Sequence, residues 1–116
     1  MTSERDIQAQ ILLALSRGPT RLLRINAGLA WQGTVLQHNR DLLVLAHPRA
    51  LRLAAPGVSD LIGWTQGRFV ALEVKGPRGR VTDEQAAFID LVRRSGGLAG
   101  VARSVEEARA ILAGKP

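Results

Sequence analysis

The sequence lacks three features that would each assign a protein to a particular class. It has no cysteine, which excludes a disulfide framework and any thiolate metal site and fits a reducing cytoplasm. Its longest apolar runs, residues 11–15 and 42–46, are far shorter than the roughly 20 residues that span a membrane. Residues 1–6 show no signal-peptide pattern. We therefore expect a cytoplasmic protein that is neither secreted nor embedded in a membrane.

Lysine is scarce in a chain that is nevertheless strongly basic. Lys and Arg number 16 against 10 Asp and Glu, and all the basic residues except Lys75 and Lys115 are arginine. The planar guanidinium fork matches phosphate, so this composition favours a nucleic-acid partner, although a GC-rich genome would also enrich arginine. The length of 116 residues, 46% of them hydrophobic, predicts a single domain over residues 1–116 with its own core.

The apolar pattern predicts an α/β fold. A helix is expected over residues 3–17, because Ile7, Ile11 and Leu15 repeat at helical spacing. Two further helices are expected to begin at Thr82 and Ser104. Strands are expected at residues 21–26, 34–37, 42–46, 58–64, 68–75 and 98–102, with a break after residue 46 at His47-Pro48. This order indicates a mixed sheet flanked by helices.

Residues 57–75 are expected to form a hairpin that places two carboxylates opposite each other. If Gln66 and Gly67 are the turn, the numbers of paired residues add up to 133, so that Asp60 faces Glu73. Side chains alternate along a strand, so Lys75 lies on the face of Glu73. Val74 points the other way, which leaves its carbonyl available as a further oxygen ligand.

Two carboxylates and a carbonyl, with no Cys or His nearby, are typical of a hard oxygen site for Mg²⁺ or Mn²⁺. The ammonium of Lys75 can orient or deprotonate a water, as metal-assisted phosphodiester hydrolysis requires. The alternative is structural: Asp60 caps a turn, while Glu73 and Lys75 form a surface pair on an edge strand.

Two further residues have both a functional and a structural interpretation. Glu4 precedes Ile7 by one helical turn, at the end of the stripe that faces the sheet, where a buried carboxylate needs a partner. It also suits the first turn of a helix, where it stabilises the helix dipole. Gln85 has the spacing of a capping-box partner of Thr82.

These motifs together resemble the PD-(D/E)XK nuclease superfamily, and more closely its VRR-NUC branch in the short stand-alone form of bacteria and phages. The likeness covers essentially the whole chain and rests on Glu4, Gly57-Val-Ser-Asp60, Glu73-Val-Lys75 and Thr82-Asp-Glu-Gln85. The resemblance implies a restriction-endonuclease-like αβββαβ core. It also implies metal ligands at Asp60, Glu73, the Val74 carbonyl and Glu4, and catalytic roles for these acids, Lys75 and Gln85.

The resemblance further implies a Mg²⁺-dependent, structure-selective DNA endonuclease that acts on branched DNA such as Holliday junctions. Mn²⁺ is expected to support activity as well, with no small-molecule cofactor, and the protein is expected to be a homodimer. Two rival functions remain open: a non-catalytic nucleic-acid-binding module that keeps the fold, and a small basic RNA-associated or structural protein.

DNA contacts are expected from four residues around the site. Arg78 and Arg80 flank a glycine directly after Lys75 and are expected to reach phosphates, or to lie in a solvated loop. Arg24 and Asn26 end a strand that leads into the site; Asn26 either binds a phosphate or forms a turn. The apolar run at residues 42–46 makes residues 29–56 the expected dimer interface, unless that run is a central strand.

Overall fold

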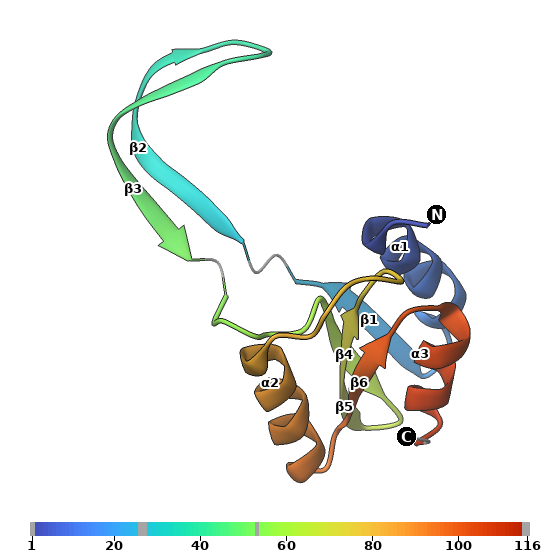
Figure 1. Ribbon diagram of the computed structural model, residues 1–116. Helices are drawn as coiled ribbons and strands as arrows, with labels where there is room; N and C mark the ends of the chain where they lie inside the picture. The colour runs from blue at the N-terminus through green and yellow to red at the C-terminus, as the bar shows by residue number, and fades with distance from the viewer. Residues whose placement is uncertain (1, 26–27, 53, 115–116) are drawn as a thin grey trace. The chain divides into compact units, whose positions relative to one another are not determined.

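The computed structural model describes residues 2–25, 28–52 and 54–114, which fall into two compact units (Figure 1). The core unit combines the two ends of the chain, up to Ile25 and from Pro56 onward, and the ribbon unit lies between them. The expectation of a single domain over residues 1–116 stays a prediction. The elements, in chain order, are α1 Glu4–Leu15, β1 Thr20–Arg24, β2 Leu29–His38, β3 Leu43–Arg52, β4 Leu61–Thr65, β5 Arg68–Val74, α2 Asp83–Arg94, β6 Leu98–Ala102 and α3 Val105–Leu112.

The core unit contains a four-stranded mixed sheet in the order β1-β4-β5-β6. The first two pairings are antiparallel, and β5 pairs with β6 in parallel through the crossover helix α2. Gln66 and Gly67 both have positive φ, 49° and 79°, as the tight turn between two twisted strands requires. The observed register pairs Ile62 with Ala71 and Trp64 with Phe69, which confirms the predicted hairpin. The predicted αβββαβ core is also confirmed.

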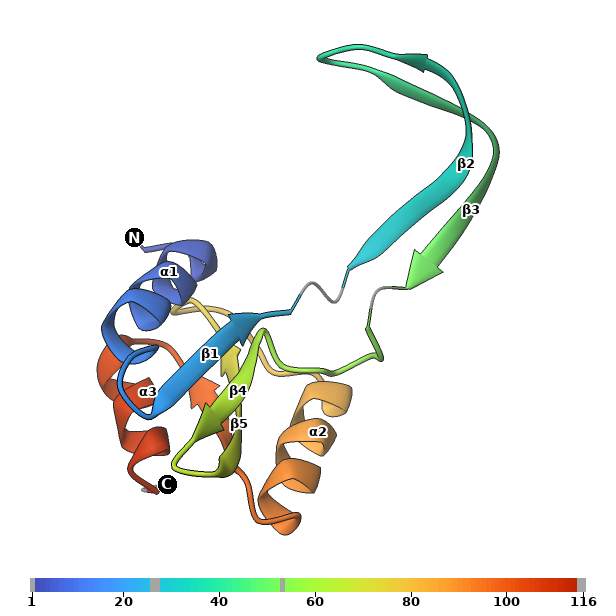
Figure 2. The same cartoon turned by 180° about the vertical axis from the view of Figure 1, so that it is seen from behind.

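Helices cover both faces of this sheet, with α1 and α3 on one face and α2 on the other (Figures 1 and 2). Alternation along β5 divides its side chains between two cores. Leu72 and Val74 join Ile7 and Ile11 of α1 in the larger core, while Ala71 packs with the α2 residues in the smaller one. Glu73 therefore lies on the α2 face of the sheet, by the same alternation.

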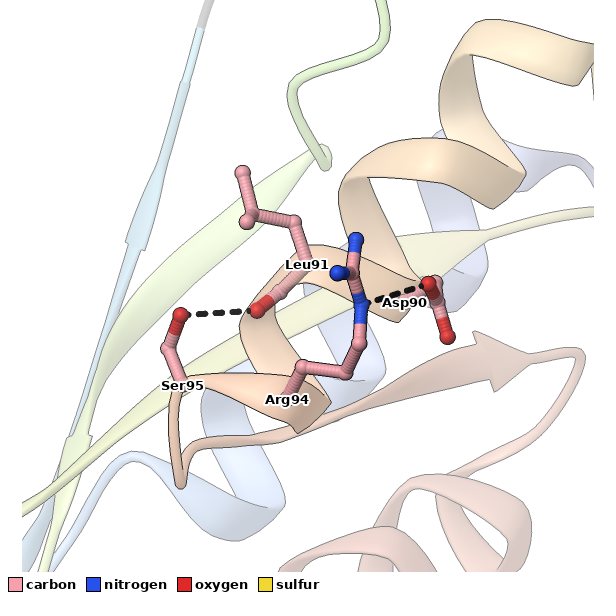
Figure 3. A network of polar contacts seen from close by, with 4 residues as sticks. All are labelled: Asp90, Leu91, Arg94 and Ser95. Atoms are coloured by element: carbon pink, nitrogen blue, oxygen red, sulfur yellow. Dashed lines mark hydrogen bonds and ion pairs between the residues drawn. The ribbon is translucent and has the colours of Figure 1, made fainter.

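The helix ends follow the predicted capping signals. Ser3 caps α1 by accepting a hydrogen bond from the Asp6 N–H, and Thr82 and Gln85 form a complete capping box on α2. At the other end of α2, Arg94 Nε lies 2.9 Å from Asp90 Oδ2, and Ser95 Oγ donates to the Leu91 carbonyl (Figure 3). The Arg94–Asp90 pair is solvent-exposed and adds little to stability.

The ribbon unit differs from the prediction. In place of two short strands broken at His47-Pro48, it contains two ten-residue antiparallel strands, and β3 continues through His47 and Pro48. A register shift between Gln32 and Thr34 takes up the irregularity, and His47 has a positive φ of 52°. Proline is tolerated because both strands are edges, so a residue without an N–H need not break the ladder.

Smaller differences concern where strands begin and end. β1 ends at Arg24, β4 begins at Leu61 and β5 ends at Val74, so each is shorter than predicted. Asn26 lies outside the described residues. Among the described residues, no helix is long and apolar enough to cross a bilayer.

Candidate metal and catalytic site

Asp60 is fixed by backbone groups of two different strands. It directly precedes β4, and its carbonyl accepts a hydrogen bond of 2.8 Å from the N–H of Ile25, the residue after β1. Its carboxylate Oδ2 accepts a hydrogen bond of 2.9 Å from the Val74 N–H of β5. The bond to Val74 crosses the hairpin, so the alternative in which Asp60 caps a local turn is wrong.

Glu73 is buried at the end of an interior strand. β5 lies between β4 and β6, and the side chain is only 1% exposed, so the alternative of a surface pair on an edge strand is also wrong. Glu73 Oε1 has no hydrogen-bond partner among the described residues. Burial, followed by the hydrogen bond and the negative charge of Asp60, raises the pKa of Glu73 to about 9, although Lys75 opposes the rise. The raised pKa favours a proton shared by the Asp60–Glu73 pair in the free protein at neutral pH.

The Val74 carbonyl points toward the same edge of the strand as Asp60. The N–H and C=O of one residue in a strand point to the same side, and the Val74 N–H is bonded to Asp60. β4 starts only at Leu61, so the ladder does not extend to this position. The Val74 side chain is fully buried in the core of α1 and α3, as predicted. One edge of β5 thus brings together two carboxylates and a backbone carbonyl.

Lys75 and Glu4 approach each other around Gly79. A Cβ atom added to Gly79 would lie 2.9 Å from Glu4 Oε2, 3.1 Å from Lys75 Cδ and 3.2 Å from Lys75 Cβ. The first turn of α1 therefore meets the loop that follows β5, and Gly79 provides the space between the two side chains. Glu4 is exposed, so the expectation of a buried carboxylate in need of a partner is wrong. Its position in the first turn of α1 fits the helix-dipole interpretation.

The donor atoms at this site are all oxygens, as a hard divalent cation requires. In the described part of the chain, no three acidic, histidine or cysteine side chains form a group that could hold a metal ion. The Asp60–Glu73 pair and the Val74 carbonyl would therefore hold an ion together with water. Glu73 Oε1, buried and without a partner in the part of the chain that the structure describes, fits this assignment, because a cation would satisfy that atom and replace the proton.

Gln85 is engaged in the structure of α2. Its Oε1 accepts a hydrogen bond of 2.9 Å from the Thr82 N–H, and its own N–H donates to Thr82 Oγ1 at 3.1 Å. The capping interpretation is confirmed, and the role implied for Gln85 in the active site stays a prediction. The start of α2 is also close to the segment that leads to Asp60, since a Cβ atom on Gly57 would collide with the Glu84 backbone.

The predicted DNA-binding arginines lie at the same edge of the sheet. Arg24 pairs with Leu61, one residue from Asp60. Arg78 and Arg80 are exposed in the loop after Lys75. These positions agree with the expected phosphate contacts, which stay predictions.

Two residues near the site were not identified from the sequence. Arg103 Nη1 donates a short hydrogen bond to the Gly76 carbonyl and so fixes the loop after Lys75. The sequence signal for Arg103 was its position directly after β6, because the parallel strands β5 and β6 have their carboxyl ends at the same end of the sheet. Ser59 is fully buried, and its Oγ has no partner within the described residues. No pattern distinguishes Ser59 from an ordinary loop serine.

An αβββαβ core with an opposed Asp–Glu pair and a neighbouring lysine at the ends of its central strands defines a restriction-endonuclease-like protein. Comparison with known families agrees: residues 4–106 match the VRR-NUC domain, and the chain belongs to this family. No curated protein matches the chain. VRR-NUC is a nuclease family, and its members typically use divalent metal ions. Membership implies DNA as the substrate.

Proposed function

We propose that the protein is a Mg²⁺-dependent endonuclease that hydrolyses phosphodiester bonds in DNA, with Mn²⁺ also able to support the reaction. The observation that carries this proposal is the buried Glu73, whose Oε1 has no partner among residues 2–25, 28–52 and 54–114 and whose carboxyl lies against Asp60. A buried carboxylate beside a second, half-buried acid is costly unless a proton or a cation neutralises it. Asp60, Glu73 and the Val74 carbonyl would hold the ion.

Each residue then has a role in hydrolysis. When bound, the ion supplies a Lewis acid for the phosphate and lowers the pKa of water. Lys75 orients the attacking water, whose oxygen bonds to phosphorus as the bond to the 3′ oxygen breaks and that oxygen takes up a proton. Glu4, whose Oε2 lies across Gly79 from the Lys75 side chain, would complete the coordination of the ion. Gln85 is assigned to the catalytic residues. The DNA around the cleaved bond is assigned to Arg24, Asn26, Arg78 and Arg80.

We further propose a homodimer that cleaves branched DNA such as Holliday junctions, because two linked active sites are needed to cut two strands. The ribbon supports this assembly. Its apolar face is defined as Leu29, Trp31, Val35 and Leu43. Each of these four residues is more than half exposed, from 54% at Leu43 to 60% at Trp31. A two-stranded ribbon is marginally stable by itself, and exposed apolar surface of this kind is typical of an interface. A second copy would cover the apolar face.

The test is cleavage of labelled junction, flap and linear DNA in Mg²⁺ or EDTA. Asp60→Asn and Glu73→Gln should each abolish cleavage while the protein stays folded. Asp90→Asn is the matched control, since it removes the same type of charge from an exposed ion pair on α2 and should leave cleavage unchanged. Near wild-type cleavage by both site variants would refute the proposal.

The same variants separate the nuclease from the non-catalytic alternative. The wild-type protein should gain thermal stability when Mg²⁺ is added, because the ion binds only the folded site. Asp60→Asn and Glu73→Gln should lose that gain. A binding module without a metal site would show no gain in any of the proteins.

A further inference from the structure

The ribbon has a second, polar face opposite the apolar one. Paired residues share a face, and residues two apart on one strand share a face. Gln32 pairs with Arg49 and Gln37 pairs with Val44, whereas Trp31 pairs with Ala50 on the other side. At each register shift only one of the two strands has an extra residue. The alternation of side chains between the two faces can therefore be followed along the other strand. This face carries Gln32, Thr34, Gln37 and Arg49, and also the smaller or apolar residues Ala30, Val44, Ala46 and Leu51. It is called the polar face because the polar residues of the ribbon other than its end residues lie on it.

The chemistry of the polar face favours a nucleic acid. Neither β2 nor β3 contains an acidic residue, so no carboxylate repels phosphate along either strand. Arg49 Nη2 donates a hydrogen bond of 2.8 Å to Gln32 Oε1, which holds the two exposed side chains together across the ribbon. Guanidinium and amide groups are the groups that bind the major-groove edges of guanine and adenine.

We propose that the polar face of the ribbon enters the major groove of duplex DNA. This inference rests on the proposed function, because it assigns part of the DNA contact to residues remote in sequence from the metal site. A two-stranded ribbon fits the major groove. Ten residues of strand extend about 33 Å, close to the roughly 34 Å of one turn of DNA.

The curvature of the ribbon agrees with this role. Figures 1 and 2 show that the two strands bend together along their length. The two register shifts, next to Gly33 and Leu36, account for the bend, since bulges increase local twist. A Cβ atom on Gly33 would lie 2.8 Å from the Ala46 carbonyl oxygen, so glycine is required there. A straight ribbon could follow a helical groove only over a shorter distance.

The experiment compares two arginines on opposite faces of β3. Binding to a fluorescent linear duplex is measured by anisotropy in EDTA, which prevents cleavage. Arg49→Ala should raise Kd by about tenfold, within the range for loss of a base-contacting arginine. Arg52 pairs with Leu29 and so lies on the apolar face. Arg52→Ala removes the same charge from that face and should raise Kd less than about threefold. Equal effects of the two substitutions, or no effect of Arg49→Ala, would overturn the proposal.

Two controls make the result specific. Arg49→Lys keeps the charge and removes the planar fork, so it should also weaken binding if Arg49 contacts a base. A duplex RNA of the same sequence has a major groove too narrow for side chains, so Arg49→Ala should not change its binding. An equal loss on RNA would overturn the groove assignment.

Failure of this inference can be distinguished from failure of the proposed function. If the wild-type protein cleaves DNA in Mg²⁺ and Arg49→Ala binds as tightly as wild type, the groove assignment alone is wrong. If the wild-type protein neither binds nor cleaves DNA, the proposed function fails as well.

Discussion

Replacing Glu73 by glutamine should change how the stability of the metal-free protein depends on pH. The pKa of Glu73 is about 9 in the folded protein and near 4.5 in an unfolded chain. Between these values the folded protein holds a proton that unfolding releases. Stability from this group is therefore fully present below about pH 4.5 and is lost as pH rises through 9. Glutamine has nearly the same shape and cannot ionise, so it removes this dependence.

The size of the effect follows from the pKa difference. Each pH unit inside the window costs the wild-type protein about 1.4 kcal/mol, or about 4 kcal/mol from pH 5 to pH 8. For a chain of this length, 1 kcal/mol corresponds to a change in Tm of about 4 °C. The difference in Tm between Glu73→Gln and the wild-type protein should therefore grow by about 5 °C for each unit by which the pH is raised.

The assay is thermal unfolding of both proteins in EDTA at pH 5, 6, 7 and 8. Groups that titrate alike in the two proteins cancel in the difference between their melting temperatures. Addition of Mg²⁺ at pH 8 should stabilise the wild-type protein and leave Glu73→Gln unchanged. Melting curves that shift in parallel across this pH range would show that Glu73 is already ionised, and the reasoning from its burial would be refuted.

Three further predictions concern the loop after β5 and the ribbon. Lys75→Ala should retain Mg²⁺ binding, measured by thermal stabilisation, while turnover falls by about 10²-fold or more; lost Mg²⁺ affinity with unchanged turnover at saturating metal would contradict its role. Gly79→Ala should lower cleavage by displacing Glu4 and Lys75, whereas Gly76→Ala, with its nearest contact at an ordinary 3.6 Å, should be active; equal activities would contradict the crowding argument. Leu43→Lys should convert a dimer into a monomer in light scattering at micromolar concentration, and a wild-type monomer that cuts both strands of a junction would refute the dimer.

The parts of the fold that depend on local signals could be predicted from the sequence. The turn at Gln66-Gly67 sets the hairpin register from Leu61 to Leu72, and Asp60 and Glu73, one residue further on each side, are joined by a side-chain hydrogen bond. Thr82 and Gln85 mark the start of α2 because the capping box needs only residues three apart. In each case the determining contacts lie within a few residues of one another.

The ribbon could not be predicted in the same way. Its strands lack a buried face, so apolar residues do not alternate regularly with polar ones. His47 and Pro48 are typical of a strand end, yet in a ribbon without a third strand the ladder continues past them. Burial of Glu73 was also outside the reach of the hairpin pattern, because it depends on the parallel pairing of β5 with β6 across the whole of α2.

The hydrogen bond between Ile25 and Asp60 has a consequence for how this protein can vary. It joins the two points at which the chain leaves and re-enters the core sheet, 2.8 Å apart. Since the cost of closing a loop grows only slowly with its length, the ribbon unit, Asn26–Ala55, can be lengthened, exchanged or shortened to a turn at little expense to the sheet. Asp60 would remain beside Val74 in every such chain. The ribbon, proposed to enter the groove, and the core, proposed to cut the DNA, are thus separate in the chain, and selection or design can alter the ribbon without rebuilding the core.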